Sequence, residues 1–132
     1  MRKYRGLLLL VASILLFAGC SADNQDTAAA KVVASFYETI VSQERDRIGT
    51  IACVDWEKNA LREVDAFMGV KAELVDLSCT AKEITGDAGT VTCSGKISAS
   101  YGNETTDFPL EGRVHTVVRE QGDWRICGFT NE

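Results

Sequence analysis

Apolar side chains recur at helical spacing between Ala28 and Ile48, and this pattern predicts a long amphipathic helix. Asp26 or Thr27 would cap its first turn, because a side-chain oxygen there accepts a backbone N–H. Gly49 fits the end of the helix. The expected buried face consists of Val33, Phe36, Tyr37, Ile40, Val41 and Ile48.

A second, shorter helix is expected from about Asp55 to Met68, where Gly69 supplies a stop signal. Its apolar residues fall on one face, which predicts that this helix also packs on a core. They are Trp56, Ala60, Leu61, Val64 and Phe67.

Beyond Val70 the pattern changes to alternation, which is typical of half-buried strands. Turn sequences at 86–89, 102–104 and 121–123 separate strands expected at about 73–83, 91–101, 110–119 and 124–129. Helices followed by hairpin-linked strands predict an α+β domain, with two N-terminal helices on a four-stranded antiparallel meander. In the first strand the expected buried face is Val75, Leu77, Cys79 and Ala81.

Residues 1–19 have the three parts of an export signal. Basic residues lie within positions 2–5, residues 7–17 are apolar apart from Ser13, and two small residues precede Cys20. The apolar run is too short for a permanent membrane span, which takes about 20 residues. The segment therefore predicts export from the cytoplasm.

The sequence LFAGC resembles the lipobox of bacterial lipoproteins, in which the cysteine is lipidated before cleavage, although Phe17 stands where Leu is usual. This resemblance implies a signal peptide at 1–19, a lipidated Cys20 with a short polar tether at 20–26, and one domain at 27–132. The domain would lie close to a bacterial membrane, outside the cytoplasm. An ordinary secretory signal and an uncleaved anchor helix are the alternatives, and both imply the same side of the membrane.

The expected mature domain is acidic. The chain has 14 Lys and Arg against 19 Asp and Glu, and loss of the signal with its three basic residues takes the net charge from −5 to −8. Such a charge argues against binding to nucleic acid or adhesion to anionic lipid head groups.

Four cysteines remain beside Cys20, and an even number predicts two disulfides in an oxidising compartment. A zinc site is the rival interpretation, but the chain has no C-x-x-C and one histidine. With Cys79 opposite Cys93 in a hairpin, the favoured pairs are Cys79–Cys93 and Cys53–Cys127, because bonded Cα atoms lie within about 7 Å. A bulge or another strand order would favour Cys53–Cys79 with Cys93–Cys127.

The element order, the long first helix and the C-terminal WRICGF strand resemble small exported members of the nuclear transport factor 2-like superfamily. The resemblance covers about residues 27–130. It implies a cystatin-like curved sheet that wraps a long helix to form a cone. The superfamily includes isomerase-like and cyclase-like enzymes, which place an Asp or a His inside the cone.

No catalytic group stands out from the sequence. His115 alternates away from the face of Leu110, Val114 and Val118, so we expect a solvated strand histidine, although Val117 on its side leaves the face open. The carboxylates and serines have no partner at catalytic spacing, and no phosphate loop or H-E-x-x-H is present. We therefore predict no enzyme, no metal and no other cofactor.

Aromatic side chains could line a ligand pocket in the cone, although core packing is their more usual role. The candidates are Phe36, Tyr37, Trp56, Tyr101 and Trp124. The leading hypothesis is a membrane-anchored, non-catalytic module that binds a small apolar ligand or an envelope protein. The alternatives are an isomerase- or cyclase-like enzyme that uses the cone pocket, and a structural lipoprotein that forms a homodimer through its sheet.

Overall fold

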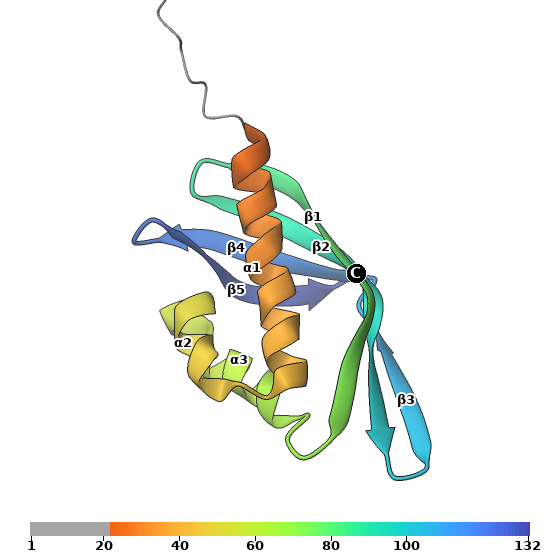
Figure 1. The fold of residues 1–132 in the computed structure, drawn as a ribbon. Helices are drawn as coiled ribbons and strands as arrows, with labels where there is room; N and C mark the ends of the chain where they lie inside the picture. Colours follow the sequence, from red (N-terminus) through yellow and green to blue (C-terminus); the bar gives the residue numbers. More distant parts are fainter. Residues whose placement is uncertain (1–21) are drawn as a thin grey trace, which may run out of the picture.

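The computed structural model describes residues 22–132, with side chains from residue 24 onward (Figure 1). The expected signal peptide and the lipidated Cys20 lie outside the described residues. The predicted α+β class is confirmed, with three α-helices and five strands within residues 22–132, where the sequence predicts two and four. The elements are α1 (Ala22–Ser42), η1 (Arg45–Arg47), α2 (Ile48–Ile51), η2 (Val54–Trp56), α3 (Glu57–Asp65), β1 (Lys71–Thr85), β2 (Ala88–Tyr101), β3 (Glu104–Pro109), β4 (Arg113–Glu120) and β5 (Asp123–Asn131).

The antiparallel sheet has the order β1-β2-β4-β5, and β3 also pairs with β2. Residues 88–92 of β2 pair with β4, whereas residues 96–101 pair with β3. The sequence predicts no separate strand before Pro109 and a strand that starts at Leu110. Instead, Leu110 donates its backbone N–H to Gly95 O at 3.0 Å, in a turn that separates β3 from β4.

A β-bulge bends the sheet at Asp76 and Gly95. The β1–β2 register shifts between Val75 and Ser78, and Asp76 has a φ of 53°. Gly95 has a φ of 97°, and a Cβ atom there would lie 2.6 Å from the Asp76 carbonyl oxygen, so a side chain would clash. Both strands turn sharply in the middle of their length (Figure 1). The prediction that Val75 lies on the buried face of β1 is wrong. The bulge shifts the alternation by one residue, so Leu74 and not Val75 packs against the core.

Helix α1 lies across one face of the sheet (Figure 1) and buries Val33, Phe36, Tyr37 and Ile40 of the predicted apolar stripe. It starts at Ala22, so residues 22–26 of the expected tether are helical. It ends at Ser42 rather than near Gly49, because Gln43 takes a φ of 60°. The Gln43 side-chain amide then donates hydrogen bonds to Phe67 O at 2.8 Å and Val70 O at 2.7 Å, which ties the end of α1 to the turn after α3.

The core lies between α1, α3 and the inner face of the sheet. Ile48, expected on the first helix, reaches this core from α2. Among the described helices, none is long and apolar enough to cross a membrane. The largest fully buried side chains include Phe36, Tyr37, Ile40, Ile48, Leu110, His115 and Ile126.

Candidate ligand pocket

A pocket of about 290 Å³ lies between α1, α3 and the strands β2, β3 and β4. This volume lies just below the range of small-ligand sites, about 300–1,000 Å³. The walls come from elements far apart in sequence, which meet because β3 folds back on β2 and α3 packs near it. The lining residues are Ile40, Glu63, Ala66, Phe67, Ile97, Tyr101, Phe108 and Arg113.

Most of the pocket wall is apolar. Ile40 and Ile97 are buried beneath it, and the Phe67 ring meets Phe108 edge-on at a centroid distance of 5.5 Å. Tyr101 remains 45% exposed. An exposed aromatic ring beside buried apolar side chains favours contact with an apolar ligand surface.

Arg113 brings a positive charge to this apolar wall. Its guanidinium lies 4.8 Å from the centre of the Phe129 ring, a cation–π contact that fixes the side chain. Within residues 24–132, no carboxylate lies within 4.0 Å of this guanidinium. Glu63 is the other charged residue of the wall. The Arg113 side chain also hydrogen-bonds the Tyr37 hydroxyl, and its remaining N–H groups are available to an acidic group on a ligand.

Behind Arg113 a buried polar chain connects helix and sheet. The Tyr37 hydroxyl lies 2.6 Å from His115 Nε2, and His115 Nδ1 lies 2.9 Å from Val91 O. A carbonyl can only accept, so Nδ1 carries the proton, and Nε2 accepts from the Tyr37 hydroxyl. Burial raises the pKa of the Tyr37 hydroxyl, and nearby Arg113 offsets part of this rise. Burial lowers the pKa of His115, which keeps the ring neutral.

The expectation of a solvated His115 is wrong, since its exposed fraction is 0%. His115 lies directly opposite buried Val91 in the β2–β4 ladder, and opposite residues share a face of the sheet. The buried residues of β4 are accordingly His115 and Val117, whereas Val114 and Val118 are half-buried. Tyr37 makes this burial possible because it satisfies the ring nitrogen.

The five aromatic residues proposed as pocket lining do not converge on one pocket. Phe36 and Tyr37 are fully buried in the core, and Trp56 packs between Phe36 and Phe129. Tyr101 lines the pocket at Arg113, whereas Trp124 lines another between α1 and the β4–β5 hairpin. Glu63 was not predicted to line a pocket, although its helical spacing from Ala60 and Phe67 puts it near the buried face of α3.

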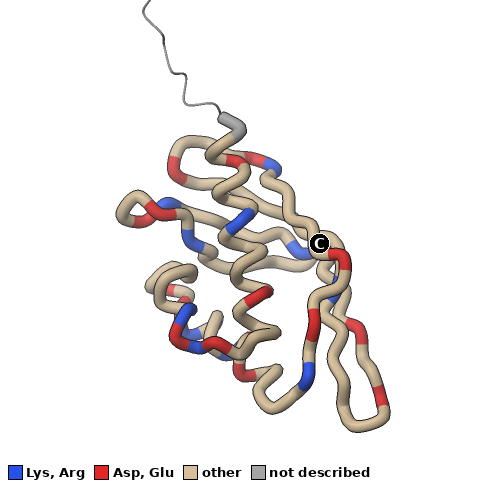
Figure 2. The backbone as a smooth tube through the Cα atoms, viewed as in Figure 1, with Lys and Arg blue, Asp and Glu red and all other residues tan. Residues whose placement is uncertain are grey.

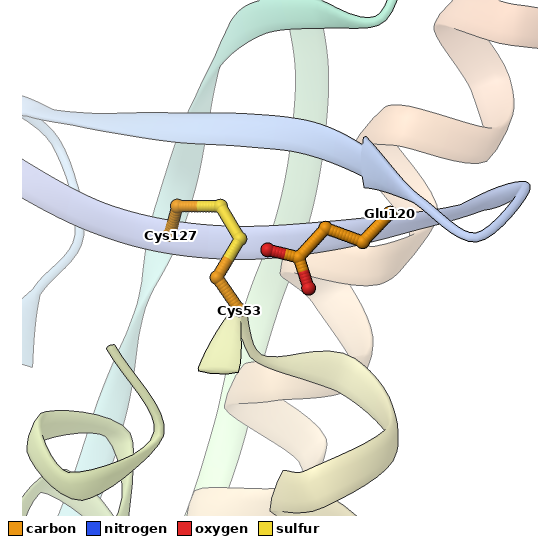
Figure 3. A group of neighbouring side chains, drawn as sticks. All are labelled: Cys53, Glu120 and Cys127. Carbon is orange, nitrogen blue, oxygen red and sulfur yellow. A yellow bond between two sulfur atoms is a disulfide. The ribbon is translucent and has the colours of Figure 1, made fainter. Parts of the chain in front are cut away.

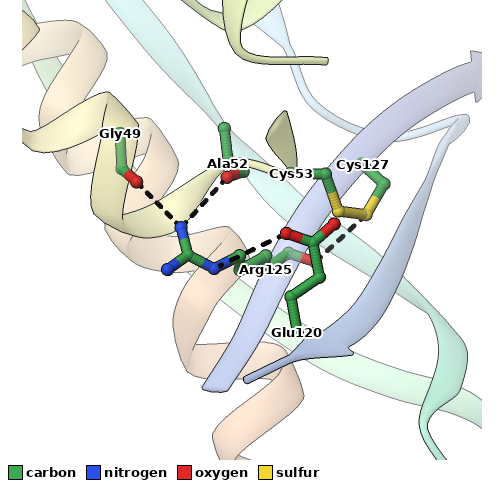
Figure 4. The surroundings of a disulfide bond; sticks show 6 residues. All are labelled: Gly49, Ala52, Cys53, Glu120, Arg125 and Cys127. Carbon is green, nitrogen blue, oxygen red and sulfur yellow. Dashed lines mark hydrogen bonds and ion pairs between the residues drawn. A yellow bond between two sulfur atoms is a disulfide. The ribbon is translucent and has the colours of Figure 1, made fainter. Parts of the chain in front are cut away.

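The two disulfides join Cys79 to Cys93 and Cys53 to Cys127, which are the pairs favoured from the sequence. Cys79 and Cys93 are direct cross-strand partners. The second bond links the chain after α2 to β5, as Figure 4 shows. Beside it, Cys53 N donates to Ile126 O at 2.8 Å, and the Arg125 guanidinium donates to Gly49 O at 2.8 Å.

Glu120 lies beside the second disulfide, and its carboxylate and the two sulfurs are within 4.8 Å of one another (Figure 3). Cysteine binds metals as the thiolate. A disulfide offers no thiolate, so in this oxidised state the group does not form a metal centre. The carboxylate instead lies 3.9 Å from Arg125 Nε.

Comparison with known proteins gives the fold and no family. No family model matches the chain, and no curated protein sequence matches it. Among solved structures, it is similar to a SEC-C motif containing protein from Rhodopseudomonas palustris, known from its solution structure. The TM-score is 0.55, the sequence identity is 11%, and the match covers 84% of each chain. This likeness concerns the fold alone.

Proposed function

We propose that this chain is a lipid-anchored, extracytoplasmic module of the bacterial cell envelope that binds a small ligand and does not catalyse a reaction. The export signal and Cys20 support the compartment and the anchor. Two disulfides are consistent with an oxidising compartment. A long helix against a bent antiparallel sheet supports kinship with the nuclear transport factor 2-like superfamily.

Arg113 carries the proposal for the ligand. It is half-buried, held over Phe129, and has no carboxylate partner within the described part of the chain. The rest of the wall is mainly aliphatic and aromatic. A small, largely apolar molecule with one carboxylate would match both features, because a charge-assisted hydrogen bond is stronger in an apolar setting.

The test compares aromatic acids with their neutral amides, such as naphthoic acid and naphthamide, by the thermal shift of the full chain in detergent. We expect the acids to stabilise the protein more than the amides. Arg113→Met keeps the apolar stem and removes the charge, so it should weaken acid binding about tenfold or more. Arg62→Met, on the exposed side of α3, is the matched control and should bind like the wild type.

Equal stabilisation by acids and amides, or acid binding that survives Arg113→Met, would show that Arg113 does not select the ligand. Export is tested separately. Mass spectrometry of protein from the membrane fraction should find a lipid on Cys20, and Cys20→Ala should release the domain from the membrane.

A further inference from the structure

A second pocket, of about 410 Å³, lies between the N-terminal half of α1, α2 and the β4–β5 hairpin. It is separate from the pocket at Arg113 and shares no lining residue with it. Its polar lining includes Lys31 and Ser35 from α1, and Arg119, Asp123 and Trp124 from the hairpin.

Two side-chain donors of this pocket wall are buried and unsatisfied. Arg119 Nε and Trp124 Nε1 have no hydrogen-bond partner within the described residues. The Asp87 carboxylate lies 4.0 Å from Arg119 Nε, too far for a hydrogen bond. Buried donors are nearly always paired in folded proteins. Both atoms belong to residues that line the pocket, so a shift of either side chain would turn its free donor towards an acceptor in the pocket.

The arrangement of the cations agrees with this. The Arg119 guanidinium carbon lies 5.0 Å from the centre of the Trp124 ring, so the two orphan donors belong to side chains in contact. Lys31 is exposed on α1, and within the described chain it forms no ion pair. Elsewhere, acidic and basic residues are interleaved over the backbone (Figure 2).

We propose that this pocket binds the phosphate group of a small, soluble ligand. A phosphate has several acceptor oxygens and up to two negative charges, which suits one guanidinium, one ammonium and one indole N–H. A carboxylate has fewer oxygens and one charge. The acidic net charge of the chain disfavours an anionic membrane surface as the source of the phosphate.

Two carboxylates near the pocket oppose the binding of an anion. Asp87 is 77% exposed at its side chain, and Asp123 is exposed at the hairpin turn, so solvent screens both. Asp123→Asn removes a repulsive charge, so it should strengthen phosphate binding, whereas the loss of a cation should weaken it.

The experiment uses Trp124 as the reporter. The chain has two tryptophans, so Trp56→Phe leaves Trp124 as the one tryptophan, whose emission is excited selectively over that of the three tyrosines. The full chain in detergent is titrated with inorganic phosphate against chloride at equal ionic strength. We expect a saturable change in fluorescence. Line broadening of free phosphate in phosphorus NMR is the second readout, since Arg119 variants could alter the fluorescence directly.

Arg119→Gln should weaken phosphate binding about tenfold or more, because it removes charge-assisted hydrogen bonds. Lys31→Gln, at an exposed helical position that does not endanger folding, should weaken it about threefold. Lys58→Gln, exposed on α3, is the matched control and should leave binding unchanged.

Three results would overturn the proposal. The first is the lack of any saturable response to phosphate over chloride, and the second is a response that neither Arg119→Gln nor Lys31→Gln weakens. The third is a response confined to protein inserted in vesicles that contain phosphatidylglycerol, relative to pure phosphatidylcholine, which would assign the pocket to a lipid head group.

Discussion

The sheet has two halves that meet at Gly95, and they are held together differently. The proximal half comprises residues 77–85 of β1, 88–94 of β2, and strands β4 and β5, and both disulfides lie in it. The distal half comprises residues 71–75 of β1, 96–101 of β2, and β3. Hydrogen bonds and apolar packing hold this second half, and neither disulfide reaches it.

The pocket at Arg113 lies against the distal half, through Ile97, Tyr101 and Phe108. Every residue of β3 except Phe108 is exposed, so this strand buries little apolar surface. Segments with few buried contacts open most easily. A ligand in the pocket would add contacts beside a strand that buries little apolar surface, whereas the disulfides lie in the other half of the sheet.

Removal of a disulfide should produce the largest effect and would weaken the contrast between the halves. Cys53→Ala with Cys127→Ala opens a separation of 74 residues and should cost about 4–5 kcal/mol, because longer loops restrict the unfolded chain more. Cys79→Ala with Cys93→Ala opens 14 residues and should cost about 3 kcal/mol. Urea unfolding measures both losses of unfolding free energy. A larger loss for Cys79→Ala with Cys93→Ala would contradict the predicted order of the two disulfides.

The junction of the two halves gives the next effect. In Gly95→Ala the new Cβ would meet the Asp76 carbonyl at a φ of 97°, which should cost about 3 kcal/mol or more. Gly102→Ala is the matched control, since its φ is 66° with nothing within 4 Å, and it should cost about 1 kcal/mol. If the two variants unfold at the same urea concentration, the close contact at Gly95 does not determine the bend.

The same junction marks the limit of what the sequence predicts. The stripe of α1, the turn positions and the pairing of Cys79 with Cys93 follow from local periodicity and hairpin length, and the structure has all of them. The Asp76 bulge follows from a contact with Gly95 on another strand. No local pattern contains that contact, so the predicted buried face of β1 is wrong on the N-terminal side of the bulge, at Val75.

The candidate pocket was less predictable for the same reason. Glu63, Phe108 and Arg113 come from α3, β3 and β4, and they meet only after β3 has paired with β2. His115 was misplaced because strand alternation does not say which face is buried. The Tyr37 hydroxyl, 78 residues away, makes burial of the ring favourable, and no sequence pattern relates the two.

The smallest predicted effect is a dependence of stability on pH that arises from His115 in the proximal half. In the folded protein burial lowers the pKa of His115 below its ordinary value of 6.5, and Arg113 adds repulsion. The unfolded chain therefore binds a proton at a higher pH than the folded protein does. The contribution to stability is complete above pH 6.5 and is lost as the pH falls towards the folded pKa.

Urea unfolding of the wild type and His115→Gln at a series of pH values isolates the contribution of His115 to the pH dependence of stability. The difference in unfolding free energy between the two proteins should be constant above pH 6.5 and should shift against the wild type at lower pH. A glutamine can still meet Tyr37 and does not titrate, so carboxylates common to both proteins cancel in the difference. A difference that moves in favour of the wild type on acidification would mean that His115 is charged in the fold. Nε2 would then donate to the Tyr37 hydroxyl, and its assignment as an acceptor would be wrong.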